Sequence, residues 1–281
     1  MSVRTDIVVV TYNSAEVMEE TLSRLEVLPG TRLIVVDNAS SDGSVGIARH
    51  HANTVIENTR NLGFGTACNL GADAGSSELI LFVNPDAGLG PDALDAMVKA
   101  ADMWPDTGAF NPQFLGADET PFQRGPGVLP GCTAVPEAFS NGEISILSGA
   151  AVLCRRTAFE AIGGFDEQIF LFFEDDDLSI RLRAGGWALR QVGDAHVRHL
   201  VGRSSTSSFA TRLLKERAFA RSELYVAAKH GIRIDRRARA LRALRRFVLA
   251  VAVFDSDRIS RNLGRFRGYI DGPYGPQSTA S

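Results

Sequence analysis

The stretch LIVVDNASSDGS, Leu33 to Ser44, joins a short apolar run to a polar cluster and predicts how this chain folds. A run of Leu, Ile and Val is typical of a buried strand, whereas Asp, Asn, Ser and Gly are typical of the turn after it. Three more short apolar runs in the first third of the chain are expected to form strands, at Asp6–Val10, Val55–Ile56 and Leu79–Val83.

Helical patterns fall between these runs. The expected helices extend from Ser14 to about Leu28, from Asp42 or Ser44 to about His51, from Gly65 to Ala74, and onward from Pro91. Ser and Asp are common helix caps, and proline fits the first helical turn. The alternation predicts an α/β fold with a mostly parallel sheet, right-handed crossovers and flanking helices. Such sheets bind ligands at the carboxyl ends of their strands.

Polar residues follow several of the predicted strands. Asp37 and Asn38 could accept hydrogen bonds from a nucleobase or a ribose, although an ordinary turn capped by Asp42 explains the same pattern. Asp86 ends a very apolar run, where a divalent cation would stabilise its charge and a simple turn is the structural alternative. The glycines at 63 and 65 form neither GxGxxG nor a GKS motif, which disfavours a Rossmann dehydrogenase or a P-loop enzyme.

The run FLFFEDDD, Phe170 to Asp177, places four acids directly behind apolar residues. We expect Ile169–Phe173 to be buried, so that at least one of the acids is partly desolvated and suited to remove a proton. Acids also stabilise the first turn of a helix, and Leu178, Ile180 and Leu182 continue a helical pattern. The residues by themselves leave catalysis and helix capping both open.

Composition divides the chain near Gly202. With 281 residues and 44% hydrophobic content, it can bury a large core. The net charge is −3, yet residues 203–267 hold 17 Lys and Arg against 5 acids, while residues 1–202 hold 13 against 27. We therefore expect a core at 1–202, a basic helical segment at 203–267 and a loose tail at 268–281. The three cysteines, Cys68, Cys132 and Cys154, are expected as reduced thiols.

The basic segment contains two expected helices, Thr211–Lys229 and Ile234–Phe254. It could lie on an anionic membrane, pack back onto the acidic core or form a homodimer interface. Nucleic acid is disfavoured because aromatic residues are not interleaved with the basic ones. No signal peptide is visible, and no apolar run reaches the roughly 18 residues of a membrane span, so we expect the cytoplasm, with peripheral contact at the inner face of the cell membrane as one option.

Seven motifs in this order resemble family 2 glycosyltransferases of the rhamnosyltransferase-like group. They extend from about Asp6 to Ser205 and read VVVTYNS, VVDNASSDGS, NLGFGTACNLG, LFVNPDA, SGAAVLCRR, GGFDEQIFLFFEDDDLSIRLRAGGW and HVRHLVGRSS. The resemblance implies a GT-A fold and inverting transfer of a sugar to a hydroxyl of a cell-envelope glycan or lipid-linked acceptor. The implied donor is a nucleotide-diphosphate sugar, with dTDP-rhamnose favoured over a UDP-sugar. A GT-A protein that binds nucleotide sugar or glycan without turnover is the alternative.

The resemblance also implies roles for single residues. Asp175 would be the catalytic base, with Asp176 as the neighbouring alternative and with Glu174 and Asp177 on the acceptor side or in support. Mg²⁺ or Mn²⁺ would be bound by Asp86 and by His199, whereas His196 is expected to be structural. Asn84 stands where the family's DxD motif has its first acid. The nucleotide-sugar pocket would comprise Thr11, Asn13, Asp37, Asn38, Asn61, Gly63, Asn69 and Asn84.

Overall fold

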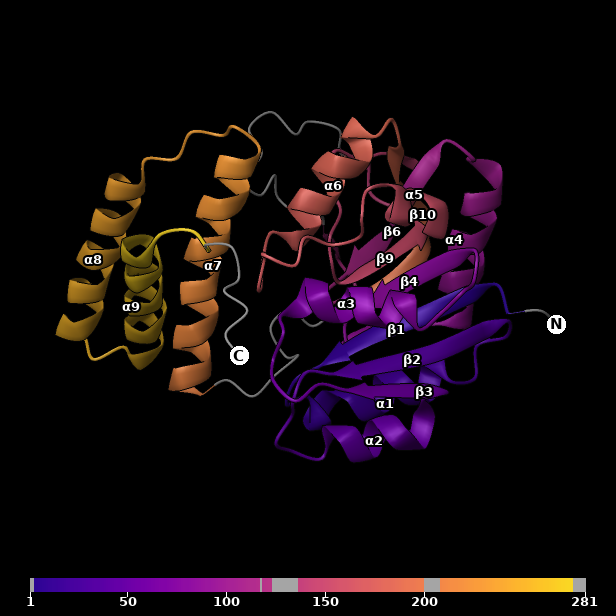
Figure 1. Cartoon of the computed structure of the whole chain (residues 1–281), viewed down its shortest axis with the longest axis horizontal. Coiled ribbons are helices and arrows are strands. Elements are labelled where there is room, and N and C mark those ends of the chain that lie inside the picture. Colours follow the sequence, from indigo (N-terminus) through magenta and orange to yellow (C-terminus); the bar gives the residue numbers. More distant parts are fainter. Residues whose placement is uncertain (1–2, 117, 123–135, 200–207, 275–281) are drawn as a thin grey trace.

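The computed structural model describes residues 3–116, 118–122, 136–199 and 208–274, except for the side chain of His199. Their strands form one mixed sheet whose main path has the order β3-β2-β1-β4-β9-β6-β10-β5, with β7 beside β6 and β8 beside β10 (Figure 1). The strands are β1 Thr5–Thr11, β2 Thr31–Asp37, β3 Thr54–Glu57, β4 Leu79–Val83, β5 Ala87–Leu89, β6 Thr107–Leu115, β7 Pro121–Phe122, β8 Gly142–Glu143, β9 Ala151–Arg155 and β10 Ala188–His199.

Six helices belong to the same part of the described chain as the sheet. They are α1 Ala15–Leu25, α2 Ser44–His51, α3 Phe64–Asp73, α4 Pro91–Met103, α5 Arg156–Ala161 and α6 Glu174–Ala184. The four strands and four helices predicted up to Pro91 are confirmed to within a few residues. β1 pairs in parallel with β2 and β4, and β2 pairs in parallel with β3, as predicted. Beyond β4 the sheet becomes mixed, because β9 is antiparallel to both β4 and β6.

The sheet is the middle of three layers. On one face, Met18 and Leu22 of α1 and Met97 of α4 belong to a fully buried apolar cluster. On the other face, Phe159 of α5 and Leu178 of α6 belong to a second cluster, which also contains side chains of α3. Burial on both faces explains why β1, β2 and β4 read as continuous apolar runs in the sequence.

The basic segment folds into a three-helix module beside the core, with α7 Phe209–Lys229, α8 Arg236–Ala252 and α9 Ser256–Asp271 (Figure 1). Of these, α9 is not predicted by the sequence. Its Gly264 and Gly268 pack against α7, where an added Cβ would lie 2.6 Å from the Leu213 carbonyl oxygen and 2.5 Å from that of Arg217. The two glycines therefore allow α7 and α9 to approach closely. α9 ends at Asp271, beyond the expected start of the tail at Gly268, and residues 275–281 lie outside the described chain.

α7 joins the module to the core. Val226 of α7 is fully buried with Ile169 and Phe173 of the segment before α6. The Lys229 ammonium lies 2.6 Å from the Asp166 carboxylate, and the Tyr225 hydroxyl donates to the same carboxylate at 2.9 Å. One helix of the basic segment thus packs on acidic residues of the core. No helix in the described part of the chain is long and apolar enough to cross a membrane.

Candidate active site

A cavity of about 290 Å³ opens at the carboxyl ends of the parallel strands β1, β2 and β4. This is the edge at which ligands of such sheets bind. The cavity is closed on one side by the segment before α6 and by α7. It is lined by Val10, Tyr12, Ser14, Asn38, Asn61, Gly63, Phe64, Asn84, Pro85, Ser148, Gly149, Ala150, Phe170, Leu171, Phe172, Glu174, Asp175 and Lys215.

The turn after β2 places a buried carboxylate and a buried amide beside this cavity. Asp37 Oδ2 accepts a hydrogen bond from the Ser40 N–H at 2.8 Å, while its buried Oδ1 has no hydrogen-bond partner among the described residues. The Asn38 side chain lines the cavity, and its amide nitrogen donates to the Gly63 carbonyl at 3.0 Å. The Asn38 carbonyl already accepts from Asn58, at 2.9 Å. Asp37 Oδ1 is thus a buried acceptor next to Asn38, and Asp37 itself does not line the cavity.

The loop before α3 crosses close to the segment that leads into α6. Gly63 has φ +92°, and a Cβ at this position would lie 2.5 Å from the Phe170 carbonyl oxygen. Only glycine fits such a contact at positive φ without moving the chain. Phe64 then donates its N–H to that same carbonyl at 3.0 Å, and Asn61 Oδ1 accepts from the Gly63 N–H at 3.0 Å. The loop and the acidic segment are consequently fixed against each other.

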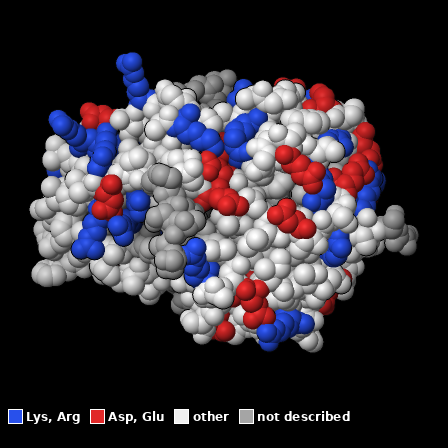
Figure 2. All heavy atoms as spheres, in the orientation of Figure 1, with Lys and Arg blue, Asp and Glu red and all other residues white. Residues whose placement is uncertain are grey.

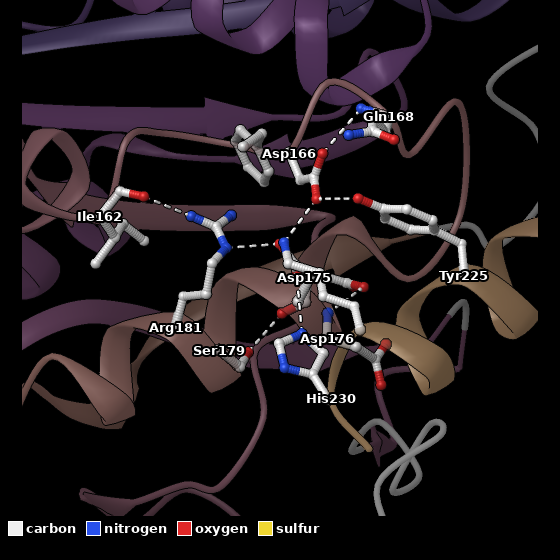
Figure 3. A network of polar contacts seen from close by, with 12 residues as sticks. Ile162, Asp166, Gln168, Asp175, Asp176, Ser179, Arg181, Tyr225 and His230 are labelled. Atoms are coloured by element: carbon white, nitrogen blue, oxygen red, sulfur yellow. Dashed lines mark hydrogen bonds and ion pairs between the residues drawn. The ribbon is translucent and has the colours of Figure 1, made fainter. Parts of the chain in front are cut away.

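The four acids of α6 are all buried, and they differ in what they face. Glu174 and Asp175 line the cavity, each with 9% of its surface exposed, whereas Asp176 and Asp177 are fully enclosed. Asp175 Oδ2 accepts the Gly149 N–H at 2.9 Å. Its Oδ1 accepts the N–H of Asp176, the next residue in Figure 3, at 3.0 Å. The expected desolvation of at least one acid is confirmed. Because Asp175 sits in the first turn of a helix, the helix dipole also stabilises its carboxylate.

Asp177 holds α6 and α7 together. Its Oδ2 lies 2.7 Å from Nε of Arg181, one turn along α6, and its Oδ1 lies 2.7 Å from the Lys229 ammonium. His230 Nε2 approaches that same oxygen at 2.7 Å. These partners give Asp177 a supporting role at the junction of the two helices.

The turn that leads into α6 is conformationally strained. Phe172 and Phe173 both adopt positive φ, at 68° and 66°, a region that bulky side chains rarely occupy. The prediction that Ile169–Phe173 is buried is wrong at Phe172, which is 36% exposed and lines the cavity. Phe219 of α7 contacts both rings, with centroid distances of 5.6 Å and 4.8 Å. The packing of α7 thus supports a backbone geometry that the local sequence disfavours.

The two predicted metal ligands are Asp86, in the turn between β4 and β5, and His199, at the end of β10. Asp86 is buried with 9% exposure just before β5, and the backbone of His199 in β10 pairs with that of Ala87. The side chain of His199 lies outside the described residues. Burial lowers the pKa of Lys215 in α7 from its usual value, and the negative charge of Asp86 opposes this shift. Among the described residues, no three His, Cys, Asp or Glu side chains are grouped to hold a metal ion.

Several predicted site residues hold the loops around the cavity in place and do not line it. Thr11 is fully buried at the end of β1, and Asn13 Oδ1 accepts the Ser41 N–H at 2.8 Å. Asn69 of α3 is bonded twice to the backbone of Phe165, at 2.9 Å each time. His196, expected to be structural, is exposed and packs edge-on against Phe139.

Sequence reasoning missed other residues of the cavity, chiefly Tyr12, Ser14, Ser148 and Lys215. The first three lie in motifs already recognised, VVVTYNS and SGAAVLCRR, so those motifs could have indicated them. Lys215 has no comparable local signal. The charge of the basic segment is visible in the sequence, but which of its lysines enters the cavity depends on how α7 packs.

Comparison with known proteins identifies the family. The model of the glycosyl transferase family 2 matches residues 6–163, more than half of the chain. The chain belongs to this family. The match covers β1 to the start of the segment before α6, and therefore most strands that border the cavity.

Two curated relatives of this family 2 member are similar in sequence. An N-acetylglucosaminyl-diphospho-decaprenol L-rhamnosyltransferase of Mycobacterium tuberculosis is 30% identical over 244 residues, covering 73% of this chain and 80% of the relative. The O-antigen biosynthesis protein RfbC of Myxococcus xanthus is 34% identical over 158 residues, or 50% of this chain and 12% of the relative. The expected rhamnosyltransferase-like resemblance is confirmed.

Solved structures confirm the GT-A fold. S. aureus TarS 1-349 in complex with UDP has a TM-score of 0.57 at 17% identity, covering 94% of this chain and 91% of that one. The mannosyltransferase PcManGT of Pyrobaculum calidifontis, in complex with GDP-Man and Mn²⁺, has a TM-score of 0.56 at 17% identity, covering 96% and 87%.

Proposed function

We propose that this protein is an inverting glycosyltransferase that uses Asp175 as its catalytic base. The observation that carries the proposal is the position of the Asp175 carboxylate. It faces the cavity, is held by the Gly149 N–H at 2.9 Å, and lies at the carboxyl ends of the parallel strands, the edge at which such sheets bind ligands. Asp176 is fully buried and does not line the cavity, which favours Asp175 as the base.

The proposed donor is a nucleotide-diphosphate sugar, with dTDP-rhamnose favoured. The name of the M. tuberculosis relative supports both rhamnose and a lipid-linked acceptor. Structural neighbours are solved with UDP, UDP-GlcNAc or GDP-Man, which keeps a UDP-sugar as the competing donor. In this chain, the cavity-lining amides of Asn38, Asn61 and Asn84 would contact the nucleotide, and Asp37, buried next to Asn38, would contribute a carboxylate behind them.

The proposed reaction is a single displacement. The acceptor hydroxyl oxygen forms a bond to the anomeric carbon while the bond from that carbon to the diphosphate oxygen breaks with its electron pair. The hydroxyl proton passes to the Asp175 carboxylate, and the nucleoside diphosphate leaves. Glu174, which lines the same cavity, would orient the acceptor, and Lys215 would offset charge on the departing diphosphate.

A divalent cation, Mg²⁺ or Mn²⁺, fits this site in part. The buried Asp86 is a hard oxygen ligand at the strand end, and His199 is the second proposed ligand because its backbone pairs next to Asp86. When bound, the cation would act as a Lewis acid on the diphosphate. Lys215 provides a positive charge of the protein's own near Asp86.

The test is a panel of nucleotide sugars, dTDP-rhamnose and UDP-sugars included, assayed for binding and slow hydrolysis with Mg²⁺ or Mn²⁺ and then with EDTA. Asp175→Asn should retain donor binding and lose roughly 10²- to 10⁴-fold in turnover with acceptor. Asp176→Asn is the matched control and should lose much less. A wild-type protein that binds a donor but shows no turnover with any acceptor would instead be a non-catalytic nucleotide-sugar or glycan-binding protein.

A further inference from the structure

The end of α8 carries a cluster of exposed apolar side chains, here called the apolar end: Val248, Leu249, Val251, Val253 and Phe254. Their exposed fractions are 57%, 67%, 45%, 65% and 91%. A single exposed leucine needs no explanation, but five large apolar side chains within seven residues form a patch. Patches of this kind mark contacts with proteins or membranes.

The same helix is strongly basic. α8 contains six arginines and no acidic residue. Arg242, Arg245 and Arg246 are exposed within two turns of the apolar end, and Arg245 precedes Val248 at helical spacing, so basic and apolar groups share the outer face. The space-filling view shows Lys and Arg outnumbering acids on the visible side of the module (Figure 2).

The two acids that follow the apolar end do not cancel this charge. Asp255 lies 3.1 Å from Arg258, and Asp257 is paired with Arg212. Both carboxylates are therefore already matched by an arginine of the module, and the arginines of α8 remain in excess. The helix therefore combines exposed arginines with exposed Leu, Val and Phe, which is the composition of a segment that lies on a bilayer surface.

The outer face of α8 points away from the core. α8 packs on α9 through Ala240, Ala243 and Tyr269. Figure 1 places α8 on the far side of the module from the sheet. The contact between the basic segment and the acidic core is made by α7, so it leaves the arginines of α8 exposed.

The apolar end of α8 lies on the same side of the helical module as the cavity. Arg212 near the start of α7 pairs with Asp257 near the start of α9, so these two helices begin together. Arg236, at the start of α8, donates to the carbonyls of Tyr269 and Ile270 at the end of α9, so α8 runs the opposite way and ends where α7 begins. Lys215, which lines the cavity, lies in the second turn of α7.

We propose that the apolar end, together with Arg242, Arg245 and Arg246, docks on a bilayer of anionic phospholipids. The apolar side chains would enter the boundary between headgroups and acyl chains, and the arginines would contact the anionic headgroups. Docking would hold the cavity beside the membrane, where a lipid-linked acceptor is found. The inference rests on the proposed function only for that acceptor, since the surface itself is defined by exposure and charge.

A second copy of this chain fits the surface less well. A two-fold interface centred on the apolar end would use the same patch on both copies and bring their nearby arginines toward each other, and like charges side by side across an interface are unfavourable. An anionic bilayer satisfies both the apolar side chains and the charge. Lipid is therefore the occupant that the observed chemistry favours.

The experiment is co-sedimentation with vesicles, without nucleotide sugar or acceptor. The wild-type chain should bind vesicles containing phosphatidylglycerol at least tenfold more tightly than vesicles of phosphatidylcholine alone. Val253→Asp with Phe254→Asp, and separately Arg242→Glu with Arg245→Glu, should each weaken that binding by about tenfold or more. Lys99→Glu with Arg183→Glu makes the same change in charge on exposed core positions and should leave binding unchanged.

Equal binding of all variants, or failure of the wild type to bind phosphatidylglycerol vesicles, would overturn the proposal. A lipid-free dimer in light scattering that Val253→Asp with Phe254→Asp converts to monomer would assign the surface to a second copy. Vesicle binding is measured without donor or acceptor, so its outcome does not depend on whether the protein is an active transferase. A protein that binds these vesicles and turns over no donor would contradict the proposed function and leave the docking surface standing.

Discussion

Replacing Lys215 by methionine tests whether the helical module takes part in donor binding. Among the described residues, Lys215 is the Lys or Arg whose side chain lines the cavity. Its ammonium is also close enough to Asp86 to feel the negative charge of that carboxylate. Methionine keeps most of the side-chain volume and removes the charge. Lys215 is partly buried, so its ammonium is partly desolvated, and this burial lowers its pKa. Its contact with a diphosphate should therefore be stronger than that of a surface ion pair.

The magnitude follows from the type of contact. A hydrogen bond from a charged donor contributes about 1.5–3 kcal/mol, and each 1.4 kcal/mol changes a dissociation constant about tenfold. Lys215→Met should consequently raise the Kd for a nucleoside diphosphate roughly 10- to 100-fold at saturating Mg²⁺. Lys215→Arg keeps the charge and should recover part of the affinity. Lys99→Met, on α4 and ion-paired only with Asp95 among the described residues, serves as the control.

The assay is calorimetric titration of each variant with dTDP and with UDP, after melting curves have shown that the variants remain folded. An affinity of Lys215→Met within twofold of the wild type, for a nucleotide that the wild type binds, would refute the argument. Lys215 would then serve only to balance the charge of the buried Asp86.

Three further predictions concern the metal, the loop and the helix junction. Replacing Asp86 by Ala should weaken donor binding, and so should adding EDTA to the wild type. EDTA should have little further effect on the Asp86→Ala variant. If the wild type keeps its full affinity for the donor in EDTA, no cation is required for binding. Gly63→Ala should lower the unfolding free energy by about 2–4 kcal/mol, because its Cβ would meet the Phe170 carbonyl oxygen at 2.5 Å at φ +92°. The control is Gly46→Ala in α2, where the added Cβ would point into open space and should not destabilise the protein. Similar melting temperatures for the Gly63→Ala and Gly46→Ala variants would contradict this account. Burial raises the pKa of Asp166, but hydrogen bonds from Lys229, Gln168 and Tyr225 outweigh it and the pKa is lowered. The stability that the Asp166 carboxylate adds is thus present above its unfolded pKa of about 3.9 and is lost as pH falls through the lower folded value. In denaturant titrations, the unfolding free energies of wild type and Asp166→Asn should therefore differ by a constant amount above pH 5 and converge in acid. A difference that does not change with pH would exclude this linkage.

Much of the first half of the fold is readable from the sequence. The runs at Asp6–Val10 and Leu79–Val83 are apolar without interruption because both faces of β1 and β4 are covered by helices. The turns after them are rich in Asn, Asp and Gly for reasons of local backbone geometry. The later strands are less apparent: β10 runs for 12 residues and includes Arg190, Gln191 and Asp194, so its polarity conceals its place in the sheet.

Part of the candidate active site is likewise visible in the sequence, and part of it depends on tertiary packing. The acidic run at Glu174–Asp177 is conspicuous in the sequence, and the prediction that it is partly desolvated is confirmed. The sequence does not indicate that Asp177 is bound by Lys229 and His230, 52 and 53 residues further along the chain. Nor does it indicate that Phe172 and Phe173 would adopt positive φ, since bulky residues disfavour that conformation unless tertiary packing supports it.

The sequence by itself determines the alternation of strands and helices, the polar turns at the strand ends and the contrast between an acidic core and a basic C-terminal segment. These properties depend on residues close together in the chain, or on composition alone. The tertiary structure decides which of the four acids face the cavity, that α7 rather than α8 packs on the core, and that Lys215 enters the site. Such contacts join residues far apart in sequence, and they arise only when the whole chain packs, because no local pattern specifies which distant side chain will fill a given space.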